Sequence, residues 1–366
     1  MSNTTDNRIQ VAYCTDLAYV QHVAVALASL LEHNDPANLC VHVVAPPLPQ
    51  QDIERLHAVA QRYGTTLNFV AFDASVLSSL REHLHISRAT YYRILLPLLI
   101  NVDKIIYFDC DMVMEADVTE LWNTDVEGCG CAGVDEENPG QTNRLSLNDD
   151  FYINAGVLVM NMAYWREHGI VQKCMTWLAE NPALAILLDQ DAINVALKGQ
   201  KRKIPLKWNL NPVPLETIEV LKQYPSRVIH FGGNVKPWHR YYDYDLQAIY
   251  KKYLDKTPWA PEFKLKEPTN VAQCLVVANQ SYEHKDLATA AYYYARGIQY
   301  RLITHKLESE LLLDVINSAH RLTNSQRFDE ATSLYRACFK HWGLPVQHVI
   351  NIYRVPGILD KLPIAA

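Results

Sequence analysis

Two aspartates separated by one residue, Asp109 and Asp111, carry the strongest chemical signal in the chain. They follow Lys104–Phe108, in which four consecutive apolar residues are typical of a short buried strand. Alternate side chains of an extended chain share a face, so both carboxylates point at one spot while Cys110 points away. Buried carboxylates repel each other, and a hard divalent ion (Mn²⁺ or Mg²⁺) relieves that repulsion and keeps positions for phosphate oxygens. The alternative is a pair of solvated turn aspartates.

A second dense stretch, Val228–His239, offers a third ligand for such an ion. His230 ends a short apolar strand, and a neutral imidazole is a good ligand for manganese beside two carboxylates. The glycine pair that follows, ending at Gly233, permits close approach of a ligand to the backbone. Lys236 is a cation suited to a diphosphate. The alternative for His230 is a purely structural histidine.

Polar residues also interrupt apolar segments. Asn154 and Gly156 lie within Phe151–Asn161, which we predict to be one buried strand. A buried asparagine must be hydrogen-bonded, either to protein or to a ligand, and a glycine leaves room for a close approach. Upstream, Arg88 and Arg93 lie in a predicted helical segment. They are either surface residues or cations for anionic substrate oxygens.

Acidic residues open the predicted helix Asp189–Leu197. In one interpretation Asp189 caps the helix and Asp191 complements its dipole. In the other, Asp189 and Gln190 hold carbohydrate hydroxyls, because carboxylates and amides supply paired acceptors and donors.

The elements that position these residues alternate between strands and helices. The expected strands are 9–14, 39–45 and 67–72, and the expected helices are 23–31, 51–63 and 165–180. This alternation predicts a mostly parallel, doubly wound sheet, whose ligands bind beyond the carboxyl ends of its strands. Thr15 and Asp16 lie at such an end, as do Asp109 and Asp111.

Composition and missing motifs exclude several classes of function. No Gly-x-Gly-x-x-Gly follows the first strand and no Gly-Lys-Ser/Thr loop occurs, which disfavours dinucleotide redox chemistry and P-loop phosphoryl transfer. The net charge of −6 gives no case for a nucleic-acid partner. No signal pattern opens the chain, and no apolar run approaches the roughly 20 residues of a membrane span. Eight cysteines without framework spacing are expected to be buried thiols in a cytoplasmic protein.

The 366 residues suit one large domain and a smaller one. We place the catalytic domain at 1–260 and a helical domain at 261–366, after a proline-rich linker at 258–268. Within the second domain, 286–294 and 328–335 echo each other and loosely resemble the second helix of a tetratricopeptide unit. We expect this domain to serve oligomerisation or partner binding. Its nearly balanced charges argue against an electrostatic membrane anchor.

Taken together, the stretches in residues 9–240 resemble family 8 of the retaining glycosyltransferases, which includes bacterial lipooligosaccharide galactosyl- and glucosyltransferases and glycogenin. The matching stretches, in the family's order, are Thr15-Asp16; His85-Ile86-Ser87 through Thr90-Tyr91-Tyr92-Arg93; Tyr107–Asp111; Tyr152–Val157; Asp189-Gln190-Asp191; and His230–Gly233 through Lys236–His239. One departure is Thr15-Asp16-Leu17-Ala18, where bacterial members often carry acidic residues or asparagine.

The resemblance implies a GT-A fold (a Rossmann-like, mostly parallel sheet flanked by helices) followed by an all-α C-terminal domain. It implies a UDP-sugar donor and Mn²⁺, with Mg²⁺ as the alternative, held by Asp109, Asp111 and His230. The implied donor-binding residues are Thr15 and Asp16 near the uridine, Gly233 and Lys236 at the diphosphate, Arg93, Asn154, Asp189 and Gln190 around the sugar, and Cys110 between the metal-binding acids. The implied catalytic residues are Asp189, Gln190 and Asn154.

In this family, transfer keeps the anomeric configuration. Gln190 falls near the face where an enzymic nucleophile is expected, and an amide is a poor nucleophile. This fits a front-face route, in which the leaving UDP oxygen helps to deprotonate the acceptor hydroxyl. Metal and Lys236 would then stabilise the charge that develops on the diphosphate.

The expected function is therefore transfer of galactose or glucose from UDP-galactose or UDP-glucose to a hydroxyl of a surface-glycan acceptor, such as lipopolysaccharide, capsule or glycoprotein. We expect a cytoplasmic enzyme, with peripheral contact at the inner face of the membrane left open. The alternatives are a glycogenin-like initiator that glycosylates itself, and a non-catalytic scaffold that acts through its helical tail.

Overall fold

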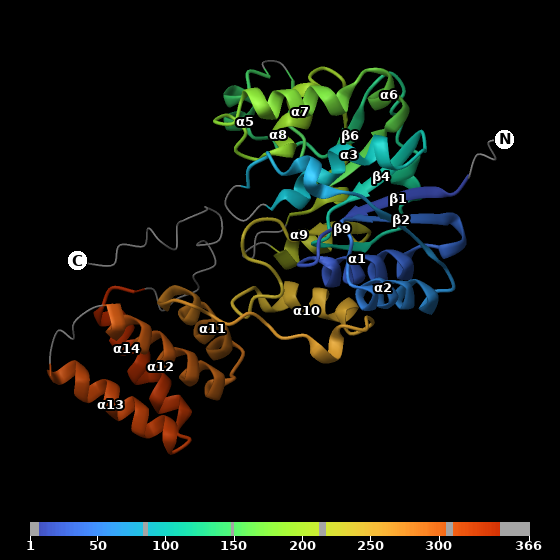
Figure 1. Cartoon of the computed structure of the whole chain (residues 1–366). Coiled ribbons are helices and arrows are strands. Elements are labelled where there is room, and N and C mark those ends of the chain that lie inside the picture. Colours follow the sequence, from blue (N-terminus) through green and yellow to red (C-terminus); the bar gives the residue numbers. More distant parts are fainter. Residues whose placement is uncertain (1–6, 83–86, 148–149, 212–216, 305–309, 345–366) are drawn as a thin grey trace. The chain divides into compact units, whose positions relative to one another are not determined.

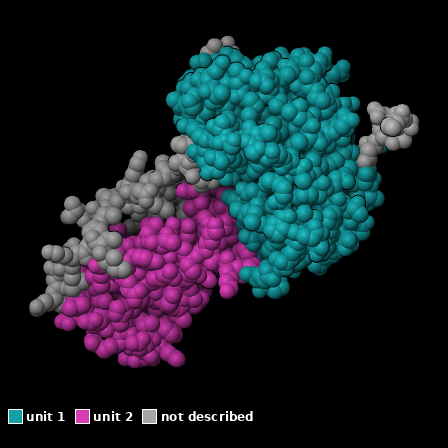
Figure 2. Space-filling view, in the orientation of Figure 1, with its two compact units in different colours: residues 1–212, 221–231, 250–262 teal, residues 213–220, 232–249, 263–366 magenta. Residues whose placement is uncertain are grey.

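The computed structural model describes residues 7–82, 87–147, 150–211, 217–304 and 310–344 (Figure 1). The chain divides into two compact units that interleave along the sequence (Figure 2). The first contains residues 1–212, 221–231 and 250–262, and the second contains residues 213–220, 232–249 and 263–366. The domain boundary predicted after residue 260 stays a prediction.

A seven-stranded sheet forms the centre of the first unit, in the order β3-β2-β1-β4-β7-β6-β8. Its strands are β1 (Ile9–Cys14), β2 (Leu39–Ala45), β3 (Leu67–Ala71), β4 (Lys104–Phe108), β6 (Cys131–Gly133), β7 (Val157–Asn161) and β8 (Lys201–Lys203). Strand β7 pairs antiparallel with both β4 and β6, whereas the other pairings are parallel. The mostly parallel sheet confirms the predicted fold class.

Helices cover both faces of this sheet. Figure 1 shows α1 (Val20–His33) and α2 (Gln50–Arg62) on one side, and α6 (Met162–Glu167), α7 (Ile170–Glu180) and α8 (Asp189–Ala196) on the other. The remaining helices up to residue 262 are α3 (Tyr92–Leu99), α4 (Thr119–Trp122), α5 (Pro139–Arg144), α9 (Thr217–Gln223) and α10 (Tyr244–Leu254).

Alternating strand residues divide the core between the two faces. Ala12 of β1, Ile105 and Tyr107 of β4, and Leu158 of β7 pack with α3 and α6–α8 in one apolar cluster. Strands β1 and β2 are buried at every position, as expected for a parallel sheet that is covered on both sides. All eight cysteines of the chain are buried thiols, as predicted.

Two predicted elements were wrong in extent. The predicted strand 151–161 begins only at Val157, because the amides of Ala155 and Gly156 bond to side chains, and before them an isolated bridge joins Ile153 to Asp135. The amide of Gly156 donates to the Asn154 side chain and that of Ala155 donates to Gln190. The predicted helix 165–180 is interrupted at Gly169, which has a φ of +61° and separates α6 from α7.

A separate two-stranded ribbon continues from the end of β4. Strand β5 (Met112–Glu115) pairs antiparallel with β9 (Arg227–His230), with Met112 opposite His230. A short 3₁₀ helix, Leu206–Asn209, precedes Leu210, whose backbone pairs with β9 on its other edge. The ribbon therefore brings two distant segments of the chain, around Leu210 and β9, to the end of β4.

The helices of the second unit that follow residue 263 form two hairpins: α11 (Val271–Glu283) with α12 (Leu287–Thr304), and α13 (Glu310–Asn324) with α14 (Phe328–His341) (Figure 1). This confirms the predicted helical C-terminal region. Lys285 follows α11 and Gln326 follows α13, and both residues have positive φ. In each turn the next amide donates to a carbonyl five residues earlier, from Asp286 to Ser281 and from Arg327 to Leu322. The echoing stretches 286–294 and 328–335 lie at the starts of α12 and α14, directly after these turns.

None of the described helices combines the length and the apolar character that crossing a membrane requires.

Candidate active site

Three potential metal ligands meet where β4 ends. Asp109, Asp111 and His230 each offer one ligand atom, and these atoms all lie within 4.8 Å of one another. Nε2 of His230 lies 3.5 Å from an oxygen of Asp111 and 3.8 Å from one of Asp109. The β5–β9 pairing explains this meeting, because the amide of Phe231 donates to the carbonyl of Asp111 at 2.9 Å. Two carboxylates and an imidazole are a donor set that suits a divalent cation.

The His230 ring is held from two sides. Its Nδ1 lies 2.9 Å from the Oδ1 of Asn209, which is also buried. On the other side the ring packs over Gly156, where a Cβ atom would lie only 2.6 Å from Cε1 of the imidazole. Glycine at this position therefore makes room for the imidazole ring. The sequence predicted a close approach at Gly156 but not that His230 makes it.

Arg93 is a buried cation at the centre of the site. Its guanidinium pairs with Asp189 at 2.8 Å and with Asp109 at 3.0 Å, and it donates to the carbonyl of Ala155 at 2.6 Å. Burial alone would lower the pKa of Arg93, but Asp109 and Asp189 outweigh it and raise that pKa. The surface interpretation was wrong for Arg93. It holds for Arg88, which is exposed and donates to the carbonyl of Leu80.

Asp189 pairs with Arg93 and does not cap its helix, so the capping alternative was wrong. The residue before the helix is Leu188, with a φ of +50°, and no side chain caps this end. Asp189 also accepts a hydrogen bond from the Thr90 hydroxyl. Burial raises the pKa of Asp189 to about 6, although Arg93 and Thr90 act in the opposite direction. A cation and a carboxylate from distant segments thus form one buried unit.

Glu136 is a member of the site that the sequence analysis missed. One of its carboxylate oxygens accepts hydrogen bonds from the amides of Asn154 at 2.7 Å and of Gln190 at 3.1 Å. Burial raises the pKa of Glu136, and these two hydrogen bonds oppose the shift. Glu136 follows the short strand β6 at the same edge of the sheet as Asp109, and the only sequence signal was an acid after the brief apolar run 131–134.

The Gln190 amide is fixed at both of its ends. Its oxygen accepts from the amide of Ala155 at 2.9 Å, and its nitrogen lies 3.1 Å from the hydroxyl of Tyr152 as well as from Glu136. Tyr152 in turn donates to Asp191, a fully buried carboxylate that also pairs with Arg144. Asp191 therefore does more than complement the helix dipole: it anchors the hydroxyl beside Gln190.

Residues 10–241, more than half of the chain, match the sequence model of Glycosyl transferase family 8. The chain belongs to glycosyl transferase family 8. The family is known for glycosyl transfer, and the buried acids, the amides and Arg93 at the end of β4 lie within the matched residues.

Individual relatives agree with this assignment. The chain is 28% identical over 275 residues to general stress protein A of Bacillus subtilis, covering 69% of this chain and 96% of that protein. It is 25% identical over 270 residues to lipopolysaccharide 1,2-glucosyltransferase of Escherichia coli K12, covering 70% of this chain and 80% of that protein. Among solved structures, the galactosyltransferase LgtC in complex with donor and acceptor sugar analogues superposes with a TM-score of 0.62 at 21% identity, covering 69% and 100% of the two chains. This last likeness confirms the GT-A fold.

Three further residues expected at the donor of this family 8 glycosyltransferase lie at the ends of β1 and β4. Thr15 is fully buried, and its hydroxyl donates to the carbonyl of Asp16. Asp16 is partly exposed and accepts from the amides of Ala18 and Tyr19. The thiol of Cys110 turns inward and donates to the carbonyl of Cys14 at 2.9 Å. Of these three side chains, only that of Asp16 is partly exposed and so open to a ligand. His85 and Ile86, which belong to the second matching stretch, lie outside the described residues.

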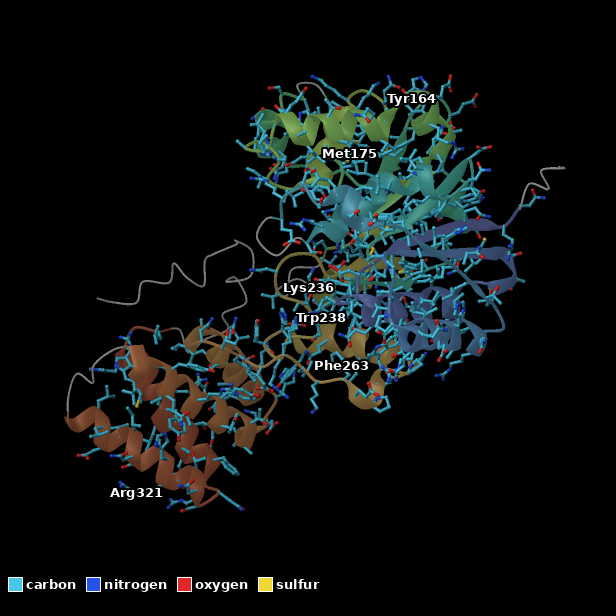
Figure 3. All side chains as sticks on the ribbon, in the orientation of Figure 1. Tyr164, Met175, Lys236, Trp238, Phe263 and Arg321 are labelled. Carbon is cyan, nitrogen blue, oxygen red and sulfur yellow. The ribbon has the colours of Figure 1, made fainter. Side chains whose placement is uncertain are left out.

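Gly233 and Lys236 follow β9 and belong to the second compact unit. Figure 3 labels Lys236. Gly233 has a φ of +84°, which explains why glycine occupies this turn. Lys236 is largely buried, and its backbone amide donates to Nδ1 of His239. The predicted contacts of both residues with a diphosphate stay predictions.

Proposed function

We propose that this family 8 glycosyltransferase is a manganese-dependent, retaining hexosyltransferase that transfers galactose or glucose from a UDP-sugar to a hydroxyl of a surface-glycan acceptor. The observation that carries the proposal is the meeting of Asp109, Asp111 and His230 beside the buried Arg93–Asp189 pair. One relative of this chain is a lipopolysaccharide glucosyltransferase, which supports a hexose donor and a glycan acceptor.

The ligand set fits a divalent ion, because three acceptor atoms of oxygen and nitrogen converge in a partly buried place. Such an ion, with Mn²⁺ as our choice and Mg²⁺ as the alternative, would stabilise negative charge on the diphosphate of the donor. In this proposal Lys236 and the turn at Gly233 contact the same diphosphate, and Asp16 lies nearest to the nucleoside.

The donor sugar would lie against Asn154, Asp189, Gln190 and Arg93. Each of these side chains is already fixed by a protein hydrogen bond or ion pair, so little conformational freedom remains to be lost when a sugar binds. Glu136 joins this set through its bonds to both amides. Pre-organised donors and acceptors of this kind stabilise charge where it develops in a transition state.

The chemistry we propose needs no enzymic nucleophile. The oxygen of Gln190, the side chain expected on the relevant face, already accepts from the amide of Ala155. The bond between the anomeric carbon and the UDP oxygen breaks, and the acceptor oxygen forms a new bond on the same face. The acceptor proton passes to the departing diphosphate oxygen. Atoms and charge balance, and the anomeric configuration is kept.

The helices that follow residue 263 are proposed to serve oligomerisation or partner binding. We place the enzyme in the cytoplasm, with peripheral contact at the inner face of the membrane as a secondary proposal. A domain division at residue 260, with the GT-A domain before it, is part of the same proposal.

The test is release of UDP from UDP-galactose and from UDP-glucose, each with Mn²⁺ and with excess chelator. We expect slow hydrolysis of one donor that depends on Mn²⁺, and a loss of about 100-fold or more in Asp111→Asn, since a metal contributes several kcal/mol at a developing charge. Asp117→Asn is the matched control, because this exposed acid only caps the turn at Thr119.

Calorimetry with UDP covers the case in which hydrolysis requires the true acceptor. If UDP fails to bind in the presence of Mn²⁺, the transferase proposal is wrong. Mass spectrometry after incubation with UDP-glucose separates the glycogenin-like alternative, because a self-glycosylating enzyme would gain hexose masses on its own chain.

A further inference from the structure

Two side-chain amides, the buried Asn209 and the half-buried Asn154, connect His230 of the proposed metal site with the proposed sugar pocket. Asn209 lies between the other two residues: its Oδ1 faces Nδ1 of His230 at 2.9 Å, and its Nδ2 donates to Oδ1 of Asn154 at 2.8 Å. Asn209 is 4% exposed. Its place is set by the backbone, because the amide of Leu210 donates to Val228 and that of His230 donates to Leu210.

The direction of this chain of hydrogen bonds is fixed by a backbone group. The amide of Gly156 donates to Asn154 at 2.9 Å, and a backbone N–H can only donate. The atom of Asn154 that faces Gly156 must therefore be its oxygen. The other end agrees, since the nitrogen of Asn154 donates to the Glu136 carboxylate. This removes the usual ambiguity between oxygen and nitrogen in an asparagine amide.

The position of the Asn154 oxygen then determines which amide atom of Asn209 is oxygen and which ring nitrogen of His230 carries the proton. Asn209 faces the oxygen of Asn154, so it must present its nitrogen there and its own oxygen to His230. An amide oxygen can only accept, which requires a proton on Nδ1 of the imidazole. A neutral ring with a proton on Nδ1 carries its lone pair on Nε2, the atom that lies between the two aspartates.

We propose that Asn209 is a positioning residue that holds His230 in the Nδ1–H tautomer, with Nε2 free to bind a divalent cation. The inference rests on the proposed metal site. It deepens that site, because the tautomer of His230, and so its ability to bind a cation through Nε2, depends on Asn154 and Gly156, two residues beside the proposed sugar pocket. Orienting partners of this kind are commonly worth 10–100-fold in metal affinity.

The first test needs no metal. ¹⁵N NMR of the metal-free protein, at a pH where the His230 ring is neutral, reports which ring nitrogen carries the proton. We expect the Nδ1–H form in the native protein and a mixture of forms in Asn209→Leu. A native protein in the Nε2–H form would overturn the proposal.

The second test is the affinity for Mn²⁺ alone, measured by calorimetry. Asn209→Leu removes the acceptor, and we expect binding about 10–100-fold weaker. Asn209→Asp keeps an acceptor for Nδ1–H and should retain affinity within a few-fold of the native protein. Asn34→Leu is the matched control, because Asn34 bonds to the backbone of Leu30, Ala116 and Val118 and contacts no proposed ligand.

Failure of this inference and failure of the proposed function give different results. If the native protein does not bind Mn²⁺, the proposed function is wrong, and the NMR experiment still decides the role of Asn209. If the native protein binds Mn²⁺ and Asn209→Leu binds it equally well, the positioning role is wrong. If Asn209→Leu does not fold, the native NMR spectrum and Asn209→Asp decide.

Discussion

The end of β4 and the helical hairpins differ in how many charged groups they bury close together. Around Asp109 the interior holds Arg93, Asp189 and His230, each in a charged or amide network with partners from distant segments. In the hairpins, most buried side chains are apolar or aromatic. The exceptions among the described residues include Asn279, which accepts from the hydroxyl of Tyr294, and Arg301, whose guanidinium lies over the ring of Trp342. Burying charge costs free energy that packing must offset, so this cost is larger in the first region, where several charged groups are buried together.

Backbone strain also differs between the end of β4 and the hairpins. Leu188 is fully buried at a φ of +50°, immediately before Asp189, in a conformation that a branched side chain seldom adopts. The positive-φ residues of the hairpins, Lys285 and Gln326, occupy helix-ending turns where such a conformation is ordinary. The first region therefore carries both buried charge and backbone strain.

The largest effect should come from removing the central cation. Arg93→Met leaves two carboxylates, Asp109 and Asp189, without their partner, and we expect a loss of about 3–5 kcal/mol in the free energy of unfolding. Denaturant unfolding measures it. Arg88→Met, a neighbouring exposed arginine, should stay within about 0.5 kcal/mol of the native protein. Equal losses in the two variants would contradict the division between the regions.

A core truncation in the hairpins should separate stability from catalysis. Phe339 is fully buried against Tyr294 and Trp342, and Phe339→Ala should cost about 3 kcal/mol. Because the proposed chemistry lies in other segments, release of UDP should continue at temperatures where the hairpins are still folded. Leu313→Ala, at a 41% exposed position, is the control. Loss of UDP release in folded Phe339→Ala would show that the hairpins contribute to the site.

The smallest effect concerns pH. Burial, together with Lys266 and Lys236, lowers the pKa of His239 to about 4. An unfolded histidine titrates near 6.5, so between pH 6.5 and 4 the unfolded chain binds more protons than the native protein and the native protein loses stability as the pH falls. With partial exposure taken into account, the loss should be about 1 kcal/mol.

Thermal unfolding of native protein and His239→Gln across this pH range measures the contribution. Other groups titrate in both proteins, so the informative quantity is the difference between the two curves. That difference should change through the window and flatten above pH 7. A constant difference would mean that His239 is not held neutral in the native protein.

Local sequence patterns were sufficient for strands β1 to β4, for helices α1, α2 and α8 and for the acid pair, whereas the short strands β6 and β8 were not predicted. Apolar runs at 9–14 and 104–108 gave their strands correctly, since burial on both faces leaves a continuous apolar signature. The late start of β7 was missed because its cause is a side chain, that of Gln190, which bonds to Ala155 from another segment. Glu136 was missed because its partners, Asn154 and Gln190, are far from it in sequence.

The sequence by itself determined the family, the parallel sheet and the acid pair at a strand end, because these depend on residue types and on periods that are local in the chain. Only the tertiary structure decided which polar groups meet. The antiparallel pairing of β5 with β9 brings His230 to Asp111, the packing of α3 against its neighbours buries Arg93 beside Asp189, and the backbone at Leu210 sets Asn209 against the imidazole. Strand pairing and burial join segments that are separate in the sequence, and no local pattern records which segments will be joined.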